Sequence, residues 1–117
     1  MGTSFVEYKD CGFWTRDSFL QNWLSGLIDD IRMAGRLEPW QEALVEHWRV
    51  QINIDGGCMS LALDEYITDS TRQQWLLSVA TRSLPRADEI GRRTGELFID
   101  LLNGRLQTTV SSPIDYL

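Results

Sequence analysis

The chain has 117 residues, of which 43% are hydrophobic and 24% are charged, a balance typical of one folded domain. Its net charge of -6 disfavours nucleic-acid binding, because phosphate backbones would be repelled. No apolar run approaches the roughly 20 residues needed to cross a bilayer, and the N-terminal stretch lacks the pattern of an export signal. We therefore expect residues 1–117 to form a single domain of a cytoplasmic protein that binds neither nucleic acid nor membrane.

The first strong helical pattern runs from Arg16 to Ala34, where apolar residues recur at steps of three and four. We expect Thr15 to cap this helix, Trp14 to pack on Phe19, and Gly35 to end the helix. The residues predicted to form its buried face are Leu20, Trp23, Leu24, Leu27, Ile28 and Ile31.

A second, shorter helix is predicted to begin at Pro39, with Trp40, Leu44 and Trp48 spaced four residues apart. Residues 50–63 then alternate between apolar and polar on both sides of Asp-Gly-Gly, which predicts a β-hairpin.

An isolated hairpin is marginal in water, so it should pack against the helices or pair with another strand. Residues 1–12 contain Phe5-Val6-Glu7-Tyr8, which could supply that extended strand.

Two more helices are predicted, the first capped by Thr68 or Asp69 and ended by Pro85. The second covers residues 87–103, where Ile90, Leu97, Phe98 and Leu101 have helical spacing, although Gly91 and Gly95 weaken its first half. Residues 107–117 are expected to be a loosely held tail. The predicted fold is mainly α (α+β), with about four helices packed around one β-hairpin.

No pattern for catalysis, metal binding or nucleotide binding occurs in the sequence. His47 is the single histidine and lacks an HExxH or a His-rich neighbourhood, so we expect it to pack beside tryptophans with its tip hydrogen-bonded or wet. The two cysteines, Cys11 and Cys58, are expected to be reduced and buried. We expect no cofactor, no metal and no enzymatic activity. A deep pocket that gathers His47 with two carboxylates would favour an enzyme instead.

Three glutamates of the second predicted helix, Glu38, Glu42 and Glu46, follow one another at intervals of four residues. This spacing places three like charges in one stripe, which costs a few tenths of a kcal/mol per pair. The stripe is either a solvated helix face balanced by nearby arginines or a surface that meets Arg and Lys of a protein partner. Trp40 lies beside it and is the predicted apolar anchor for such a partner.

The segments Gly12–Asp17, Trp23-Leu24, His47–Gln51 and Leu63–Glu65 together resemble the layout of some small bacterial immunity proteins. Such proteins are cytoplasmic antidotes that bind the toxin of a polymorphic or contact-dependent system. The resemblance implies a chain that neutralises a basic toxin domain. Its predicted contact residues are Glu38, Trp40, Glu42, Glu46, Asp64 and Glu65. The alternative is a regulatory or adaptor protein that forms a homodimer through an apolar helix face.

Overall fold

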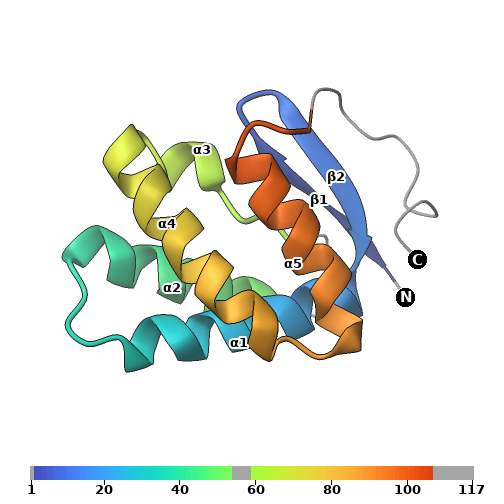
Figure 1. Ribbon diagram of the computed structural model, residues 1–117, viewed down its shortest axis with the longest axis horizontal. Helices are drawn as coiled ribbons and strands as arrows, with labels where there is room; N and C mark the ends of the chain where they lie inside the picture. The colour runs from blue at the N-terminus through green and yellow to red at the C-terminus, as the bar shows by residue number, and fades with distance from the viewer. Residues whose placement is uncertain (1, 54–58, 107–117) are drawn as a thin grey trace.

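Helices pack against a two-stranded hairpin at one side of the computed structural model, which describes residues 2–53 and 59–106 (Figure 1). In chain order the elements are β1 (Thr3–Tyr8), β2 (Cys11–Arg16), α1 (Asp17–Met33), α2 (Pro39–Ile52), α3 (Leu63–Tyr66), α4 (Ser70–Ser83), the 3-10 helix η1 (Leu84–Arg86) and α5 (Glu89–Leu102). The predicted fold class, mainly α with one β-hairpin in a single globule, is therefore confirmed.

The hairpin is formed by the N-terminal residues, so its predicted position over residues 50–63 is wrong. Val50 and Ile52 belong to the last turn of α2, and Leu63 begins α3. The Asp-Gly-Gly segment of the prediction lies within residues 54–58, outside the described residues. Val50 is 51% exposed, because α2 continues as a helix whose buried residues are Gln41, Leu44, Val45 and Trp48.

The two strands of the hairpin are joined by Lys9 and Asp10, which have φ angles of 51° and 67°. Two consecutive positive φ angles are what a two-residue type I′ turn requires. The inner face of the hairpin is formed by Ser4, Val6, Tyr8, Phe13 and Thr15, all buried. The extended segment expected within residues 1–12 is thus present as β1.

Thr15 belongs to β2 and is buried, so the prediction that it caps α1 is wrong. Its hydroxyl lies 2.8 Å from the hydroxyl of Thr94 on α5, and this hydrogen bond joins the hairpin to that helix. Trp14 packs on Phe5 across the hairpin with ring centroids 5.1 Å apart, and its predicted packing on Phe19 stays a prediction.

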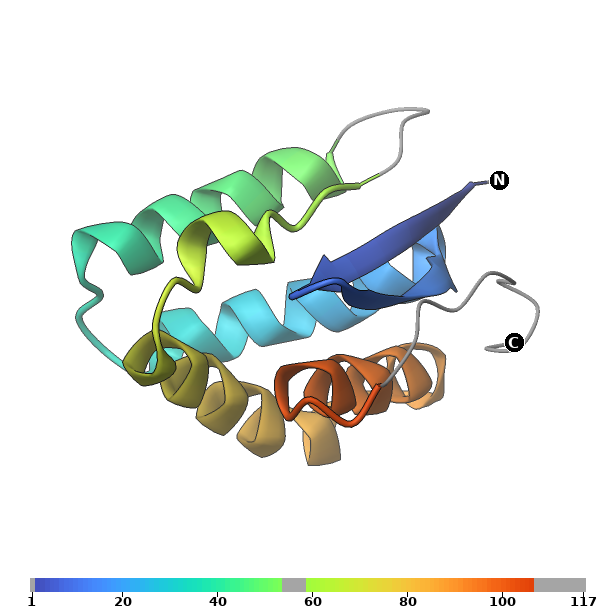
Figure 2. The same cartoon turned by 90° about the horizontal axis from the view of Figure 1, so that it is seen from above.

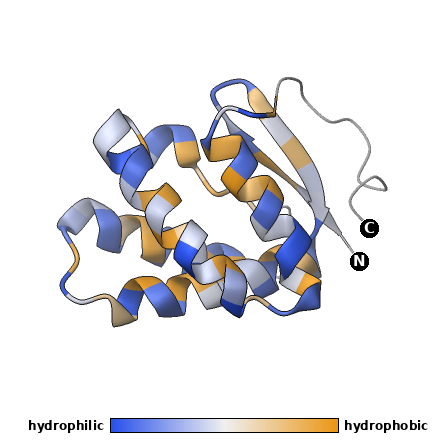
Figure 3. Cartoon of the chain, viewed as in Figure 1, coloured by the Kyte–Doolittle hydropathy of each residue, from blue (hydrophilic) through white to orange (hydrophobic). Residues whose placement is uncertain are grey.

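Helix α1 lies at the centre of the molecule and contacts α2, α4, α5 and the hairpin (Figure 2). Its six predicted core residues are all buried, and hydrophobic residues recur along α1 and along the helices that it contacts (Figure 3). Gly35 follows the helix with a φ of 119°, as predicted for its end.

Two glycines allow α5 to approach α1 closely. A Cβ atom built on Gly95 would lie 2.6 Å from Cζ3 of Trp23, and one on Gly91 would lie 3.1 Å from the backbone nitrogen of Trp23. Real Cβ atoms do not come as near as the first distance, so Gly95 is required where the Trp23 ring packs. The glycines that weaken the helical pattern therefore permit the central helix contact.

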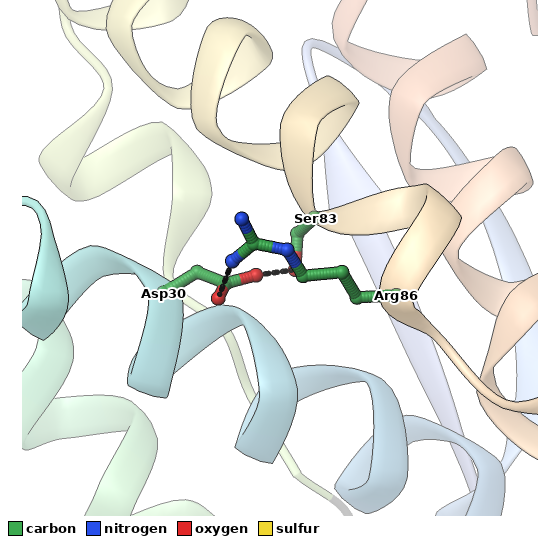
Figure 4. Close-up of polar contacts among 3 residues, drawn as sticks. All are labelled: Asp30, Ser83 and Arg86. Carbon is green, nitrogen blue, oxygen red and sulfur yellow. Dashed lines mark hydrogen bonds and ion pairs between the residues drawn. The ribbon is translucent and has the colours of Figure 1, made fainter.

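Asp30 of α1 fixes the junction between α4 and η1 (Figure 4). Its carboxylate accepts a hydrogen bond from the Ser83 hydroxyl at 2.6 Å and one from Nη1 of Arg86 at 2.8 Å. The two bonds hold the end of α4 against α1 through one side chain.

The predicted helices after residue 67 are confirmed, with small changes at their ends. Asp69 caps α4 by accepting a hydrogen bond from the backbone N–H of Arg72. Asp88 caps α5 in the same manner, accepting from the N–H groups of Ile90 and Gly91. Ile90 lies within α5 as predicted and is 50% exposed, whereas Leu97, Phe98 and Leu101 are buried.

Of the residues covered by the predictions for the two cysteines and for the C-terminal tail, the structure describes only Cys11. Cys11 is a free, half-buried thiol at the start of β2. Cys58 and residues 107–117 lie outside the described residues.

Replacing Gly95 with alanine should destabilise the protein by about 1–3 kcal/mol, because the added methyl group overlaps the Trp23 ring. The matched control is Gly26→Ala in α1, where an added Cβ meets nothing within 4 Å. This control should stabilise the protein by up to about 1 kcal/mol, since alanine favours a helix. Chemical denaturation measures both, and equal effects of the two substitutions would contradict the proposed contact.

Asp88→Asn should reduce stability in a pH-dependent manner. The N–H of Gly91, the Asn22 side chain and the N–H of Ile90 bond to the carboxylate and hold the pKa of Asp88 below its ordinary range. The charged group therefore stabilises the fold above the unfolded-state pKa of about 3.9, and this contribution is lost as pH falls through the lower folded-state pKa. Denaturation at several pH values should show the two proteins converging in acid. A constant difference down to the lowest pH would contradict the prediction.

Candidate protein-binding surface

The three glutamates of α2 do not act as one uniform acidic stripe. Glu38 is the N-cap residue, and its side chain accepts a hydrogen bond from the backbone of Gln41. Gln41 in turn accepts from the backbone N–H of Glu38 at 2.7 Å, which completes a capping box. Glu46 lies 3.7 Å from Arg49 in an exposed ion pair. Two of the three carboxylates therefore have partners within the chain.

Glu42 and Glu46 line a hollow between α2 and the end of α1. Arg32 and Arg36 line the same hollow, so its charge is mixed. A basic partner would meet two arginines there as well as two glutamates, which weakens electrostatic attraction.

Trp40 packs inward against α4. Its ring lies edge-on to that of Trp75, with centroids 5.1 Å apart, and the guanidinium of Arg72 lies 4.4 Å from the Trp40 centroid. The side chain is half-buried. Trp40 therefore joins α2 to α4 in this conformation, with one side covered by the arginine.

The other two predicted contact residues, Asp64 and Glu65, lie on α3 and line a separate groove. The segment 59–62, which precedes α3, runs between α2 and β1 and forms the base of this groove (Figure 2). Glu7 of β1 brings a third carboxylate from far away in the sequence. We name this site the acidic groove; its lining residues are Phe5, Glu7, His47, Met59, Ser60, Leu61, Ala62, Leu63, Asp64 and Glu65.

Among the described residues, the lining of the acidic groove contains no lysine or arginine to offset its carboxylates. Lys9 is two residues after Glu7 in the sequence, but its ammonium lies over the Tyr8 ring, 5.2 Å from the ring centroid. Beneath the carboxylates, Met59, Leu61 and Leu63 are 4%, 3% and 1% exposed. The groove thus combines exposed negative charge with a buried apolar base.

Hydrogen bonds from both sides hold the base of the groove in place. From α2, Nε1 of Trp48 donates to the Leu61 carbonyl at 3.0 Å. From β1, the Ser4 hydroxyl accepts a bond from the backbone N–H of Met59 at 2.8 Å. At the hairpin turn, the backbone N–H of Lys9 donates to the Asp64 carboxylate at 3.0 Å. The base and walls of the groove are therefore held by hydrogen bonds within the chain.

His47 contributes to the groove wall through a structural contact. Its Nε2 lies 2.8 Å from the carbonyl oxygen of Ser60 and therefore carries the proton that it donates. Its ring also packs beside Tyr66, with centroids 5.9 Å apart. Among the described residues, no hydrogen bond or ion pair joins His47 to a carboxylate.

Glu7 is the groove residue that the sequence pattern did not single out. It occupies an outward position in the alternation of β1, where Val6 and Tyr8 point inward. The same alternation, visible in the sequence Phe5-Val6-Glu7-Tyr8, could have identified Glu7 as an exposed residue of the strand. Placing the hairpin at residues 50–63 separated Glu7 from α3 and concealed the cluster.

Searches against known protein families, curated proteins and solved structures find no match to this chain. Within residues 2–53 and 59–106, no helix is long and apolar enough to span a membrane. The same residues contain no group of three or more side chains suited to holding a metal ion.

Proposed function

We propose that the chain is a non-catalytic binding protein that captures a basic protein domain in the acidic groove. The observation that carries this proposal is the convergence of Glu7, Asp64 and Glu65 around a groove whose described lining residues include no lysine or arginine. A cationic surface would be drawn to such a site, since like-signed carboxylates add their potentials. The fixed apolar base would then exclude water from the contact.

The form of this function that agrees best with the sequence is immunity to a bacterial toxin. An antidote has to recognise its toxin quickly and cover its active surface, and both needs are served by a rigid, charged groove. Rigid walls lower the entropy lost on binding. In this proposal Asp64 and Glu65 keep the contact role expected from the sequence and Glu7 joins them. Glu42 and Glu46 would lie at the margin.

The direct test is to purify the chain with the product of the neighbouring gene and look for a complex by size exclusion. Co-expression should also relieve any toxicity of that product. Absence of both a complex and relief would contradict the proposal.

Glu65→Arg should weaken the complex by about ten- to a hundredfold, because it places a positive charge at the rim of the groove. Glu96→Arg on the exposed face of α5 makes the same change in net charge outside the groove. Isothermal titration of both variants should show near wild-type affinity for the control. Equal losses would mean that net charge, and not the groove, governs binding.

A further inference from the structure

The wall of the acidic groove that β1 forms combines an aromatic ring with a carboxylate. Phe5 and Glu7 are two residues apart on the outward face of the strand, and both line the groove. Glu7 is opposite Gly12 in the hairpin, and a Cβ atom built on Gly12 would lie 2.6 Å from Cζ of Phe5. Since opposite Cβ positions in an antiparallel pair are about 4.5–5.5 Å apart, the Phe5 ring ends beside Glu7.

The Phe5 ring is held in this position by its neighbours on β2. Trp14 packs on it with the two ring planes inclined at 50° and the centroids 5.1 Å apart. Gly12 has no side chain, so the ring can lie over it. Phe5 is nonetheless only half-buried. Part of the ring is therefore open to a molecule that enters the groove.

The base of the groove suits a flat cation better than a compact one. Met59, Leu61 and Leu63 are buried apolar residues. The carbonyl oxygens of Ser60, Leu61 and Ala62 already accept hydrogen bonds from α2 or α3. A lysine ammonium is strongly hydrated and would lose water there without gaining free acceptors in return. A guanidinium is planar, is more weakly hydrated and directs its N–H groups outward in its own plane, so it can lie flat on such a surface.

The acceptors that the groove does offer are carboxylates at its rim. Among the described residues, Glu7 and Glu65 form no ion pair within 4.0 Å. Asp64 accepts one hydrogen bond, from the backbone N–H of Lys9. A carboxylate can accept two parallel N–H bonds from the edge of one guanidinium, which an ammonium cannot supply. Glu7 is therefore placed to bind the edge of a guanidinium whose face lies on the neighbouring ring.

The chain already contains this arrangement at another place. The guanidinium of Arg72 lies 4.4 Å from the centroid of the Trp40 ring, and its Nη1 donates to the Tyr66 carbonyl at 2.9 Å. The group therefore combines an aromatic contact with a hydrogen bond to an oxygen acceptor. Phe5 and Glu7 present the same two partners, a ring beside an oxygen acceptor, to a residue from outside the chain.

We propose that the acidic groove selects an arginine side chain of its partner, with the guanidinium face on the Phe5 ring and its edge bonded to the Glu7 carboxylate. This inference rests on the proposed function, in which the groove captures a basic protein surface, and it names the residue that enters. Attraction between the cation and the ring, together with the weak hydration of the guanidinium, favours arginine over lysine at this position.

An NMR titration of the isotopically labelled full chain with two peptides tests the proposal. One peptide is arginine-rich, and the other has lysine at every arginine position. Followed at the amides of Glu7 and residues 59–65, the arginine peptide should bind about fivefold more tightly or better. Equal affinities would overturn the selection of arginine and leave the proposed function standing. If neither peptide shifts these amides, the proposed function fails and this inference fails with it.

Substitutions of Phe5 and Glu7 locate the preference. Phe5→Leu should bring the two affinities within about twofold of each other, whereas Phe5→Tyr keeps an aromatic face and should retain the preference. Phe19→Leu, the same change at a half-buried ring outside the groove, is the control and should also retain it. Glu7→Gln should weaken the arginine peptide by about fivefold or more. A preference that survives Phe5→Leu, or an arginine affinity unchanged by Glu7→Gln, would overturn the proposal.

Discussion

The close contact of the Trp23 ring with Gly95 determines how the rest of the structure assembles. It brings α5 against α1 along a line where both glycines of α5 face Trp23. Thr94 lies next to Gly95 on the same turn of α5. Its hydroxyl forms a hydrogen bond with that of Thr15, which joins the hairpin to the helices. A larger residue at position 95 would push α5 outward and move Thr94 with it. The hairpin, including β1 and Glu7, is therefore placed in part by this packing contact.

The acidic groove is a product of the same assembly. Once the hairpin is set, β1 holds segment 59–62 from one side through Ser4, and α2 holds it from the other through Trp48 and His47. These bonds place α3 at the end of the segment, with Asp64 tied to the hairpin turn. Three carboxylates from distant parts of the sequence are thereby brought together on a fixed base. Preorganisation of this kind lowers the entropic cost of binding.

The helices could be predicted because their apolar spacing reflects burial. The spacing of Leu20, Trp23, Leu27 and Ile31 gives one continuous buried face on α1. The hairpin could not be located, because its turn residues Lys9 and Asp10 are not the Asn-Gly or Asp-Gly pair that marks such turns. The alternation over residues 50–54 was too short to tell a strand from the last turn of a helix.

The site was predicted only in part for a related reason. Periodicity shows which residues share a helix face, and it placed Glu38, Glu42 and Glu46 together. It does not show that Glu38 bonds within a capping box or that Arg32 and Arg36 share the hollow with Glu42. Trp40 was expected to be available to a partner, because its contact with Trp75 joins two separate helices and cannot be seen in the spacing of either one. Contacts between distant segments, such as the approach of Glu7 to α3, cannot be recognised from the periodicity of the sequence.

In the proposed function the acidic groove, and not the face of α2, attracts a cationic protein surface. The most direct measurement is an NMR titration of the isotopically labelled chain with a short arginine-rich peptide, following each backbone amide. Shifts should centre on Glu7 and on residues 59–65, with small changes along Glu38–Glu46. Shifts that centre on Glu38–Glu46 and leave residues 59–65 unmoved would contradict the claim.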